Sequence, residues 1–145
     1  PIKQAQSFTN TRKFEKIDLP PVIDFEGGSL AKVKSKRKSV EQVQADLLTC
    51  LKEVEKITGR KPMIYTNGGT GNVYLNKPEF ADYPLWVANY PRDMKTKNPE
   101  MPGAWKGTKW LFWQKSQSYK IGTTTNDFDK FNGTISELKA FIEGK

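Results

Sequence analysis

Four short apolar runs, each followed by turn-forming residues, constrain the fold of this chain more than any other feature. They cover residues 19–26, 62–66, 83–90 and 110–116. Such near-continuous apolar sequence is typical of strands in a parallel sheet that is buried on both faces. Amphipathic helical patterns alternate with the runs, so we expect an α/β fold in which helices cover a parallel sheet.

The best-defined helix is expected to begin after Ser39 and to end at Gly59. The Ser39 side chain can form a capping box with Gln42, and glycine is a common helix stop. Between these ends the apolar residues recur with helical period, at Val40, Val43, Leu47, Leu48, Leu51, Val54 and Ile57.

The remaining segments are shorter. Residues 67–71, Asn-Gly-Gly-Thr-Gly, are predicted to form a turn before a short helix at 73–75. A fifth strand is expected near residues 125–128, parallel or nearly parallel to the others, and Thr134 is expected to cap a last helix. A long polar loop between the third and fourth strands carries Pro91, Pro99 and Pro102.

Composition removes most of the common catalytic groups. The 145 residues include no histidine and one cysteine, which excludes a Ser-His-Asp triad, a Cys-His pair, an imidazole metal site and an internal disulfide. Carboxylates are then the main candidates for proton transfer, and we predict neither a metal nor a cofactor. The net charge of +8 favours an anionic partner. No apolar stretch approaches the ~18 residues of a membrane span, so no membrane partner is predicted.

Asp24 and Glu26 form the sharpest candidate site. Because side chains alternate along a strand, both carboxylates project from one face, with Cα atoms about 6.5 Å apart. Neighbouring carboxyl groups raise each other's proton affinity, which leaves one as a general acid and the other ionised, the pairing that glycoside hydrolysis needs. The alternative is a helix cap or a cation ligand. Asp127 and Asp129 form a second such pair, for which a solvated turn is the alternative.

Aromatic residues near the ends of the predicted strands are candidates for a sugar-binding surface. Their rings can stack on sugar faces, and the polar atoms of Tyr and Trp can bond hydroxyl groups. Core packing is the alternative for each ring. It is favoured for Trp113, whereas Tyr90, at a strand exit, is predicted to lie at the surface or in a cleft. The candidates are Tyr65, Trp86, Tyr90, Phe112 and Trp113.

Five sequence blocks, in their order and spacing, resemble glycoside hydrolase family 25. They are Leu-Pro-Pro-Val-Ile-Asp-Phe-Glu (19–26), Lys-Pro-Met-Ile-Tyr-Thr-Asn (61–67), Tyr-Pro-Leu-Trp-Val-Ala-Asn-Tyr (83–90), Trp-Leu-Phe-Trp-Gln (110–114) and Asp-Phe-Asp-Lys-Phe-Asn-Gly (127–133). Members of this family are Chalaropsis-type lysozymes, which are retaining muramidases with a modified TIM-type β/α barrel of eight strands. The resemblance spans nearly all of this chain but only the later part of the family's domain. Residues 1–145 are therefore expected to form one partial domain with the fourth to eighth strands and without the first three.

The resemblance also implies roles for individual residues. Glu26 would be the general acid, Asp24 its acidic companion, and Asp127 a further carboxylate at the mouth of the site. The family has another aspartate at the end of its first strand, outside this sequence. The substrate would be the β-1,4 bond between N-acetylmuramic acid and N-acetylglucosamine in peptidoglycan, cleaved by a protein that is secreted or acts at the cell wall. The sugar groove would be lined by Tyr65, Trp86, Tyr90 and Gln114.

Two other functions stay open. A non-catalytic carbohydrate-binding remnant would keep the aromatic groove but lack the first-strand acid. A nucleic-acid binder is suggested by the net charge and by the basic stretch 32–38, but a solvated charge run is favoured, so nucleic acid is not predicted as a partner. An incomplete barrel is also expected to expose an apolar edge or face, to be covered by a complementary N-terminal segment or by self-association.

Overall fold

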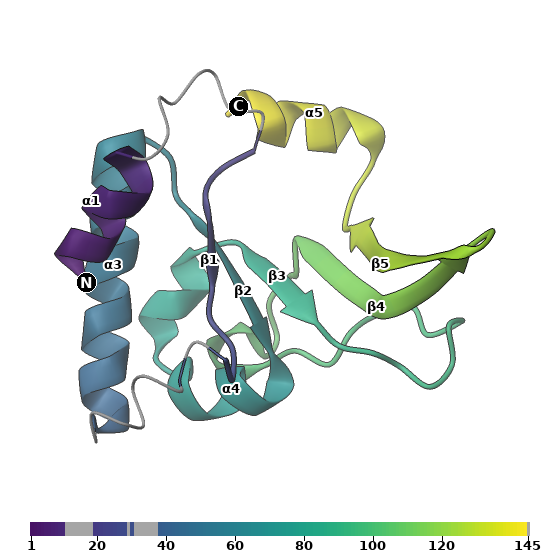
Figure 1. Cartoon of the computed structure of the whole chain (residues 1–145), viewed down its shortest axis with the longest axis horizontal. Helices are drawn as coiled ribbons and strands as arrows, with labels where there is room; N and C mark the ends of the chain where they lie inside the picture. The colour runs from purple at the N-terminus through teal and green to yellow at the C-terminus, as the bar shows by residue number, and fades with distance from the viewer. Residues whose placement is uncertain (11–18, 29, 31–37, 145) are drawn as a thin grey trace.

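The computed structural model describes residues 1–10, 19–28, 30 and 38–144. These residues form a mixed α/β fold on a curled five-stranded sheet, a half-barrel with strand order β1-β2-β3-β4-β5 (Figure 1). The strands are β1 (Val22–Asp24), β2 (Met63–Asn67), β3 (Leu85–Ala88), β4 (Phe112–Ile121) and β5 (Thr124–Phe131). The helices are α1 (Ile2–Asn10), α3 (Val40–Thr58), α4 (Gly68–Tyr74) and α5 (Ile135–Glu143), with short 3-10 helices η1 (Pro78–Asp82) and η2 (Gly103–Trp105).

The first four strands run parallel, as the apolar runs predict. Their register aligns one residue from each strand in a row across the sheet. Asp24 pairs with Tyr65, Tyr65 with Trp86, and Trp86 with Phe112. Side chains at paired positions project from the same face of a sheet. The register therefore places the Asp24 carboxylate on one face with three of the candidate aromatic residues, Tyr65, Trp86 and Phe112.

The fifth strand corrects the expectation of an all-parallel sheet, because β5 runs antiparallel to β4. Both strands are longer than predicted and form a hairpin that extends away from the sheet (Figure 1). Gly122 makes the tight turn, with a φ of 60°. A parallel neighbour would need a crossover of about a dozen residues, and the short separation between the two strands leaves no room for one.

The two capped helices are confirmed at the predicted ends. Ser39 and Gln42 form the capping box of α3, and Gly59 ends the helix in the left-handed conformation, with a φ of 69°. Thr134 and Glu137 form the capping box of α5. None of the helices in the described ranges is long and apolar enough to cross a membrane.

Helix α1 was not predicted, because the first residues of the chain are polar. It packs beside α3 (Figure 1), and the side chain that it buries is small: Ala5 is 1% exposed. The helix has three apolar residues, and two of them, Ile2 and Phe8, are exposed, so its signal in the sequence is weak. Packing against α3, rather than a pattern in its own sequence, therefore accounts for this helix.

The glycine-rich segment after β2 is helical rather than a turn, which corrects the prediction for residues 67–71. Asn67 is the N-cap of α4, and its Oδ1 accepts from the backbone N–H of Thr70 at 3.0 Å. The helix needs a residue without a side chain at Gly71, where an added Cβ would lie 2.6 Å from Cβ of Pro102. Close packing against the following loop thus explains a helix built from poor helix formers.

The loop between β3 and β4 is folded onto the body of the protein. Its Trp105 is 1% exposed and donates from Nε1 to the carbonyl oxygen of Tyr83 at 3.0 Å. The loop also contacts the end of α4, where the N–H of Ala104 donates to the carbonyl oxygen of Leu75 at 2.7 Å. Trp113 of β4 is fully buried, as predicted.

Lys115 of β4 is a buried lysine that fixes the first part of this loop. It is 8% exposed, and its Nζ donates to the carbonyl oxygens of Met94 at 2.6 Å and Thr96 at 2.7 Å. The same ammonium group lies 4.7 Å from the centre of the Trp113 ring. The backbone of the loop thus supplies the acceptors that a buried ammonium group requires.

Replacing Lys115 with Met is expected to reduce the free energy of unfolding by about 2 kcal/mol, because two charge-assisted hydrogen bonds are lost while the apolar stem is kept. Trypsin should then cleave faster at Arg92, Lys95 and Lys97 in the released loop. Urea unfolding and limited proteolysis measure both effects. Lys120→Met is the control, because Lys120 is exposed on the same strand. Equal cleavage rates in the two variants would contradict this role for Lys115.

Candidate active site

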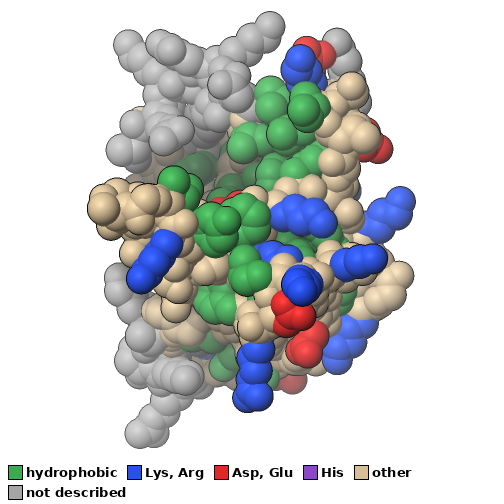
Figure 2. Space-filling view, turned by 90° about the vertical axis from the view of Figure 1, so that its right-hand side faces the viewer, with side chains coloured by type: hydrophobic (Ala, Val, Ile, Leu, Met, Phe, Trp, Pro, Cys, Tyr) green, Lys and Arg blue, Asp and Glu red, His purple; other side chains and the backbone are tan. Residues whose placement is uncertain are grey.

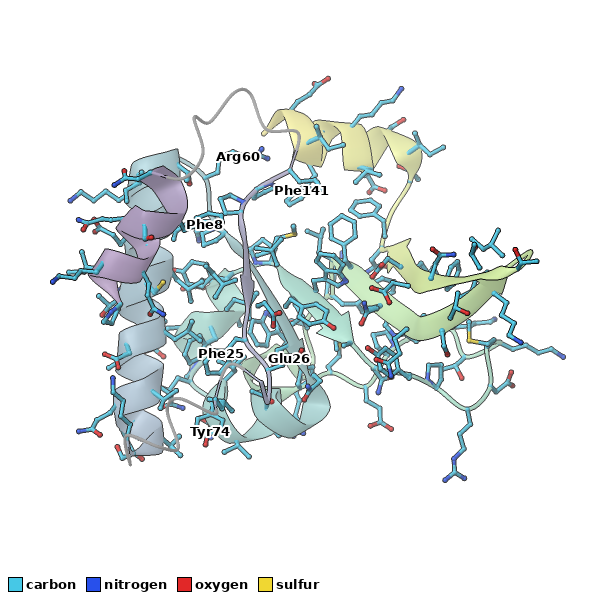
Figure 3. All side chains as sticks on the ribbon, in the orientation of Figure 1. Phe8, Phe25, Glu26, Arg60, Tyr74 and Phe141 are labelled. Atoms are coloured by element: carbon cyan, nitrogen blue, oxygen red, sulfur yellow. The ribbon has the colours of Figure 1, made fainter. Side chains whose placement is uncertain are left out.

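The carboxylate pair lies at the carboxyl end of β1 and faces β2. The backbone N–H of Phe25 donates to the carbonyl oxygen of Tyr65 at 2.9 Å, which extends the pairing beyond the strand. The Phe25 ring is buried and packs edge-on against Tyr74, with ring centres 6.2 Å apart. Figure 3 shows Glu26 at this end of β1, above α4.

Asn67 joins Glu26 to the helix that follows β2. Its Nδ2 lies 3.5 Å from Oε2 of Glu26, at the long limit of a hydrogen bond, while its Oδ1 caps α4. One side chain therefore holds both the start of a helix and the candidate acid. The sequence contains no local signal for the contact with Glu26, because 41 positions separate the two residues.

Tyr65 lies between the carboxylates and the rest of the site. Burial raises the pKa of Tyr65 above its ordinary value, and the hydrogen bond and charge of Tyr90 together with the charges of Glu26 and Asp24 raise it further. The charges of both carboxylates thus act on the Tyr65 hydroxyl. Tyr65 is therefore a neutral hydrogen-bond donor at physiological pH.

The side chain of Gln114 in β4 binds two tyrosine hydroxyls. Its Oε1 accepts from Tyr65 at 2.7 Å and from Tyr90 at 2.5 Å, and the residue is 7% exposed. Tyr90 itself is 46% exposed, in agreement with the predicted surface or cleft position. Residues from three consecutive strand ends thus form one hydrogen-bonded group, with phenolic edges available to a ligand.

The Trp86 ring is the centre of an aromatic row along the same face. It meets Tyr65 edge-on at 5.4 Å between ring centres and Phe112 at 5.9 Å. The row continues from Phe112 to Phe131 at 5.3 Å. Trp86 is half-buried, so part of its ring is accessible. Such a partly accessible row is suited to stacking on sugar rings.

The second aspartate pair, Asp127 and Asp129, lies on β5, and its two members have different contacts. Asp129, which pairs with Gln114 across the hairpin, accepts from Nε1 of Trp86 at 2.8 Å. Both aspartates are exposed, and Asp127 lies closer to the hairpin tip. Desolvation raises the pKa of Asp129, the charge of Asp127 adds to the rise, and the bond from Trp86 opposes it. Asp129 was not among the predicted site residues, although the Asp-x-Asp spacing puts it on the same face as Asp127.

The sequence-predicted residues thus come together in part. Seen from the side of the hairpin, hydrophobic side chains gather in the middle of the surface, with Lys and Arg side chains around them (Figure 2). Among the described residues, no group of three or more Cys, Asp and Glu side chains is arranged to hold a metal ion. The residues that form the connected group are Asp24, Glu26, Tyr65, Trp86, Tyr90 and Gln114, with Asn67 and Asp129 added by the structure.

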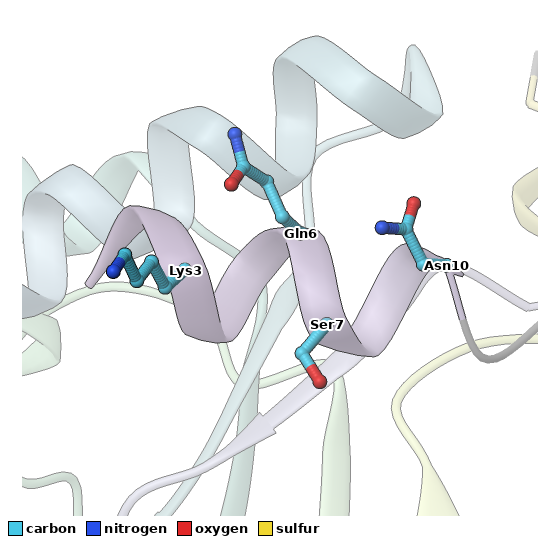
Figure 4. Close-up of a pocket in the computed structure, with 4 residues that line it drawn as sticks. All are labelled: Lys3, Gln6, Ser7 and Asn10. Carbon is cyan, nitrogen blue, oxygen red and sulfur yellow. The ribbon is translucent and has the colours of Figure 1, made fainter.

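A separate hollow lies on α1, away from the carboxylates (Figure 4). Its described lining consists of Lys3, Gln6, Ser7 and Asn10. None of these side chains is acidic or aromatic. This hollow therefore offers neither a proton donor nor a stacking surface, and the candidate site is the one at the ends of the strands.

Comparison with known proteins identifies the family of this chain. The sequence profile described as "Glycosyl hydrolases family 25" matches residues 1–124. The chain belongs to glycosyl hydrolase family 25. A curated relative in Escherichia coli strain K12, the uncharacterized protein YegX, is 36% identical over 143 residues, covering 97% of this chain and 47% of the relative. The chain thus spans about half the length of the curated relatives that it matches.

Solved structures with the same fold include enzymes of this family. A family GH25 lysozyme from Aspergillus fumigatus is 30% identical, with a TM-score of 0.73 over 96% of this chain and 65% of the other. A muramidase from Acremonium alcalophilum is 25% identical, with a TM-score of 0.74 over 99% and 67%. A bacterial lysozyme from Streptomyces coelicolor is 24% identical, with a TM-score of 0.77. The match covers 99% of this chain and 66% of the lysozyme, and it supports the fold.

Proposed function

We propose that this chain carries the acid-catalytic part of a peptidoglycan-hydrolysing muramidase, which cleaves the β-1,4 bond between N-acetylmuramic acid and N-acetylglucosamine with retention. The observation that carries the proposal is the carboxylate pair at the end of β1, which faces Tyr65 and, through it, the Trp86 row. Membership of glycosyl hydrolase family 25 and the fold shared with proteins named lysozyme and muramidase support it.

In this proposal Glu26 donates a proton to the glycosidic oxygen as the bond breaks. Asp24 supplies the negative charge that stabilises the oxocarbenium-like centre. Retention requires an intermediate at C1, formed either with an enzyme carboxylate or with the substrate's own acetamido group. Water then attacks C1 and displaces that group, while Glu26, now acting as a base, takes a proton from the water and so recovers its own. Asp127 acts as a further carboxylate at the mouth. Both roles of Glu26 require its carboxyl group to be held in a fixed position. The contact with Asn67 supports this requirement.

The sugar rings would lie against the aromatic row and the hydrogen-bonded group beside it. Trp86 offers a ring face, and the hydroxyls of Tyr65 and Tyr90, held on Gln114, offer polar edges. The net charge of +8 concentrates the protein on an anionic wall. We therefore place its action at the cell wall, on peptidoglycan glycan strands.

The two outer strands of the described sheet, β1 and β5, support a second proposal. In the described structure β1 pairs with one strand, β2, and β5 with one strand, β4. We propose that the five strands are the later part of a modified β/α barrel and that a complementary N-terminal segment, or a second copy, pairs with these free edges. Mixing the chain with the N-terminal part of a longer relative, followed by sedimentation velocity, distinguishes the two arrangements.

The function is tested by incubating the chain, alone and with such an N-terminal part, with purified peptidoglycan. Borohydride reduction followed by mass spectrometry should give fragments that end in reduced N-acetylmuramic acid. Sedimentation with intact walls, but no new reducing ends in either mixture, would instead indicate the carbohydrate-binding remnant. Salt-dependent binding to DNA at physiological ionic strength, without wall binding, would favour a nucleic-acid binder.

Replacing Trp86 with Ala is expected to weaken glycan binding, raising KM about three- to tenfold with a smaller change in kcat, because a stacking surface is lost while the carboxylates stay. Kinetics on soluble peptidoglycan fragments measure both parameters. The control is Tyr119→Ala, which removes an exposed aromatic ring near the tip of the hairpin. A larger loss in kcat than in KM would contradict a binding role for Trp86.

A further inference from the structure

The bond between Trp86 and Asp129 connects two strands that are not neighbours in the sheet. Trp86 belongs to β3 and Asp129 to β5, with β4 between them. The indole Nε1–H donates to Oδ1 of Asp129 at 2.8 Å, across 43 positions of sequence. Nε1–H is the single hydrogen-bonding group of a tryptophan side chain. Asp129 therefore controls the one polar contact through which the ring can be oriented.

The apolar contacts of the ring do not fix its orientation by themselves. Tyr65 touches it edge-on, with an interplanar angle of 83°, and Phe112 lies at a tilt of 50°. Ring contacts of this kind tolerate rotation, since the terminal torsion of a tryptophan side chain has a broad energy well. A directional hydrogen bond to a carboxylate removes that freedom.

We propose that Asp129 is a positioning residue that fixes the plane of the Trp86 indole, so that the ring presents a constant face to a bound glycan. The inference rests on the proposed function, because it assigns Trp86 to the sugar groove. Asp129 itself does not react. Asp129 pairs with Gln114 across the β4–β5 hairpin, so the register of the hairpin determines where the Trp86 ring is held. The same two strands thus position both the tyrosine hydroxyls, through Gln114, and the stacking surface, through Asp129.

The charge environment agrees with this arrangement. Desolvation raises the pKa of the Asp129 carboxyl, and the bond from Trp86 opposes the rise, as expected for a carboxylate that accepts an indole hydrogen. Asp127, two positions along the strand, has the same charge and is also exposed, but the bond from Trp86 goes to Asp129. The two aspartates therefore provide a matched pair of substitutions on one strand.

The test uses the indole N–H resonances of the ¹⁵N-labelled chain. The four tryptophans give four such resonances, and loss of one in Trp86→Phe assigns Trp86. In Asp129→Ala we expect this resonance to move upfield and its hydrogen to exchange about tenfold faster. Asp129→Asn keeps an acceptor oxygen and should restore most of the parent's values. Asp127→Ala, which removes an equal charge, should leave the resonance in place.

Binding of tri-N-acetylchitotriose, measured by calorimetry, supplies the second measurement. Asp129→Ala should weaken binding about five- to tenfold, with recovery in Asp129→Asn. An affinity equal to the parent's overturns the inference, whether or not the resonance moves. If the parent binds this sugar but releases no reducing ends from peptidoglycan, the hydrolase proposal fails while the role of Asp129 is still decided by the variants. A parent that binds no glycan overturns both.

Discussion

Hydrolysis of peptidoglycan is expected to fall about 10²–10⁴-fold when Glu26 is replaced with Gln, while glycan binding persists. The amide has the shape of the carboxyl group and keeps an oxygen that can accept from Asn67. It has no acidic proton to give to the leaving oxygen. The initial rate of reducing-end release, measured with or without the N-terminal part as activity requires, gives the size of the loss, and sedimentation with walls reports binding.

The matched control for this change is Glu79→Gln. Glu79 is an exposed glutamate in η1, which precedes β3 and so lies toward the amino ends of the parallel strands, away from the carboxylate pair. Its substitution should leave the rate unchanged. If Glu26→Gln hydrolysed peptidoglycan as fast as the parent, Glu26 would be abandoned as the acid and Asp127 would become the candidate.

The companion carboxylate should show a related but distinguishable effect. Asp24→Asn is expected to depress the rate, because it removes the negative charge that stabilises positive charge on the sugar. The proposed proton donor, Glu26, is kept, so the loss should be smaller than in Glu26→Gln. The initial rate of reducing-end release compares the two variants.

A second large effect is expected at Gly103, where substitution by Ala should reduce the free energy of unfolding by about 3 kcal/mol or more. The residue has a φ of +52°, and an added Cβ would lie 2.3 Å from the carbonyl oxygen of Leu75 and 2.6 Å from that of Gly71. Both obstacles are backbone atoms of α4 and its C-cap, so no side-chain rotation relieves the clash. Urea unfolding followed by tryptophan fluorescence measures the loss.

Gly107 is the control that separates backbone strain from the clash. Its φ is +84°, but no heavy atom lies within 4 Å of an added Cβ. Gly107→Ala should therefore cost about 1 kcal/mol, the strain of a left-handed residue alone. Equal losses in the two variants would show that the contact with α4 contributes nothing. Because Asn67 caps α4 and also contacts Glu26, Gly103→Ala should disturb the active site as well.

The local features of this protein follow from its sequence. Ser39 and Thr134 cap the helices because the capping bonds join residues three positions apart. The positions of the parallel strands follow from apolar runs that only a doubly covered sheet can bury. Asp24 and Glu26 share a face because side chains alternate along an extended chain. Each of these results depends on interactions within a few residues.

Tertiary structure decided the features that depend on distant partners. The direction of β5 depends on its hairpin with β4, and α1 is a short helix that packs against α3. The helix α4 forms in a glycine-rich sequence of low helix propensity. The site shows the same division. Sequence identified the Asp-x-Asp pair, but the register of the hairpin brought Asp129, rather than Asp127, to the indole of Trp86. The physical reason is that a strand's periodicity determines which face a side chain occupies, whereas its partner on that face depends on how far the neighbouring strands are shifted along each other.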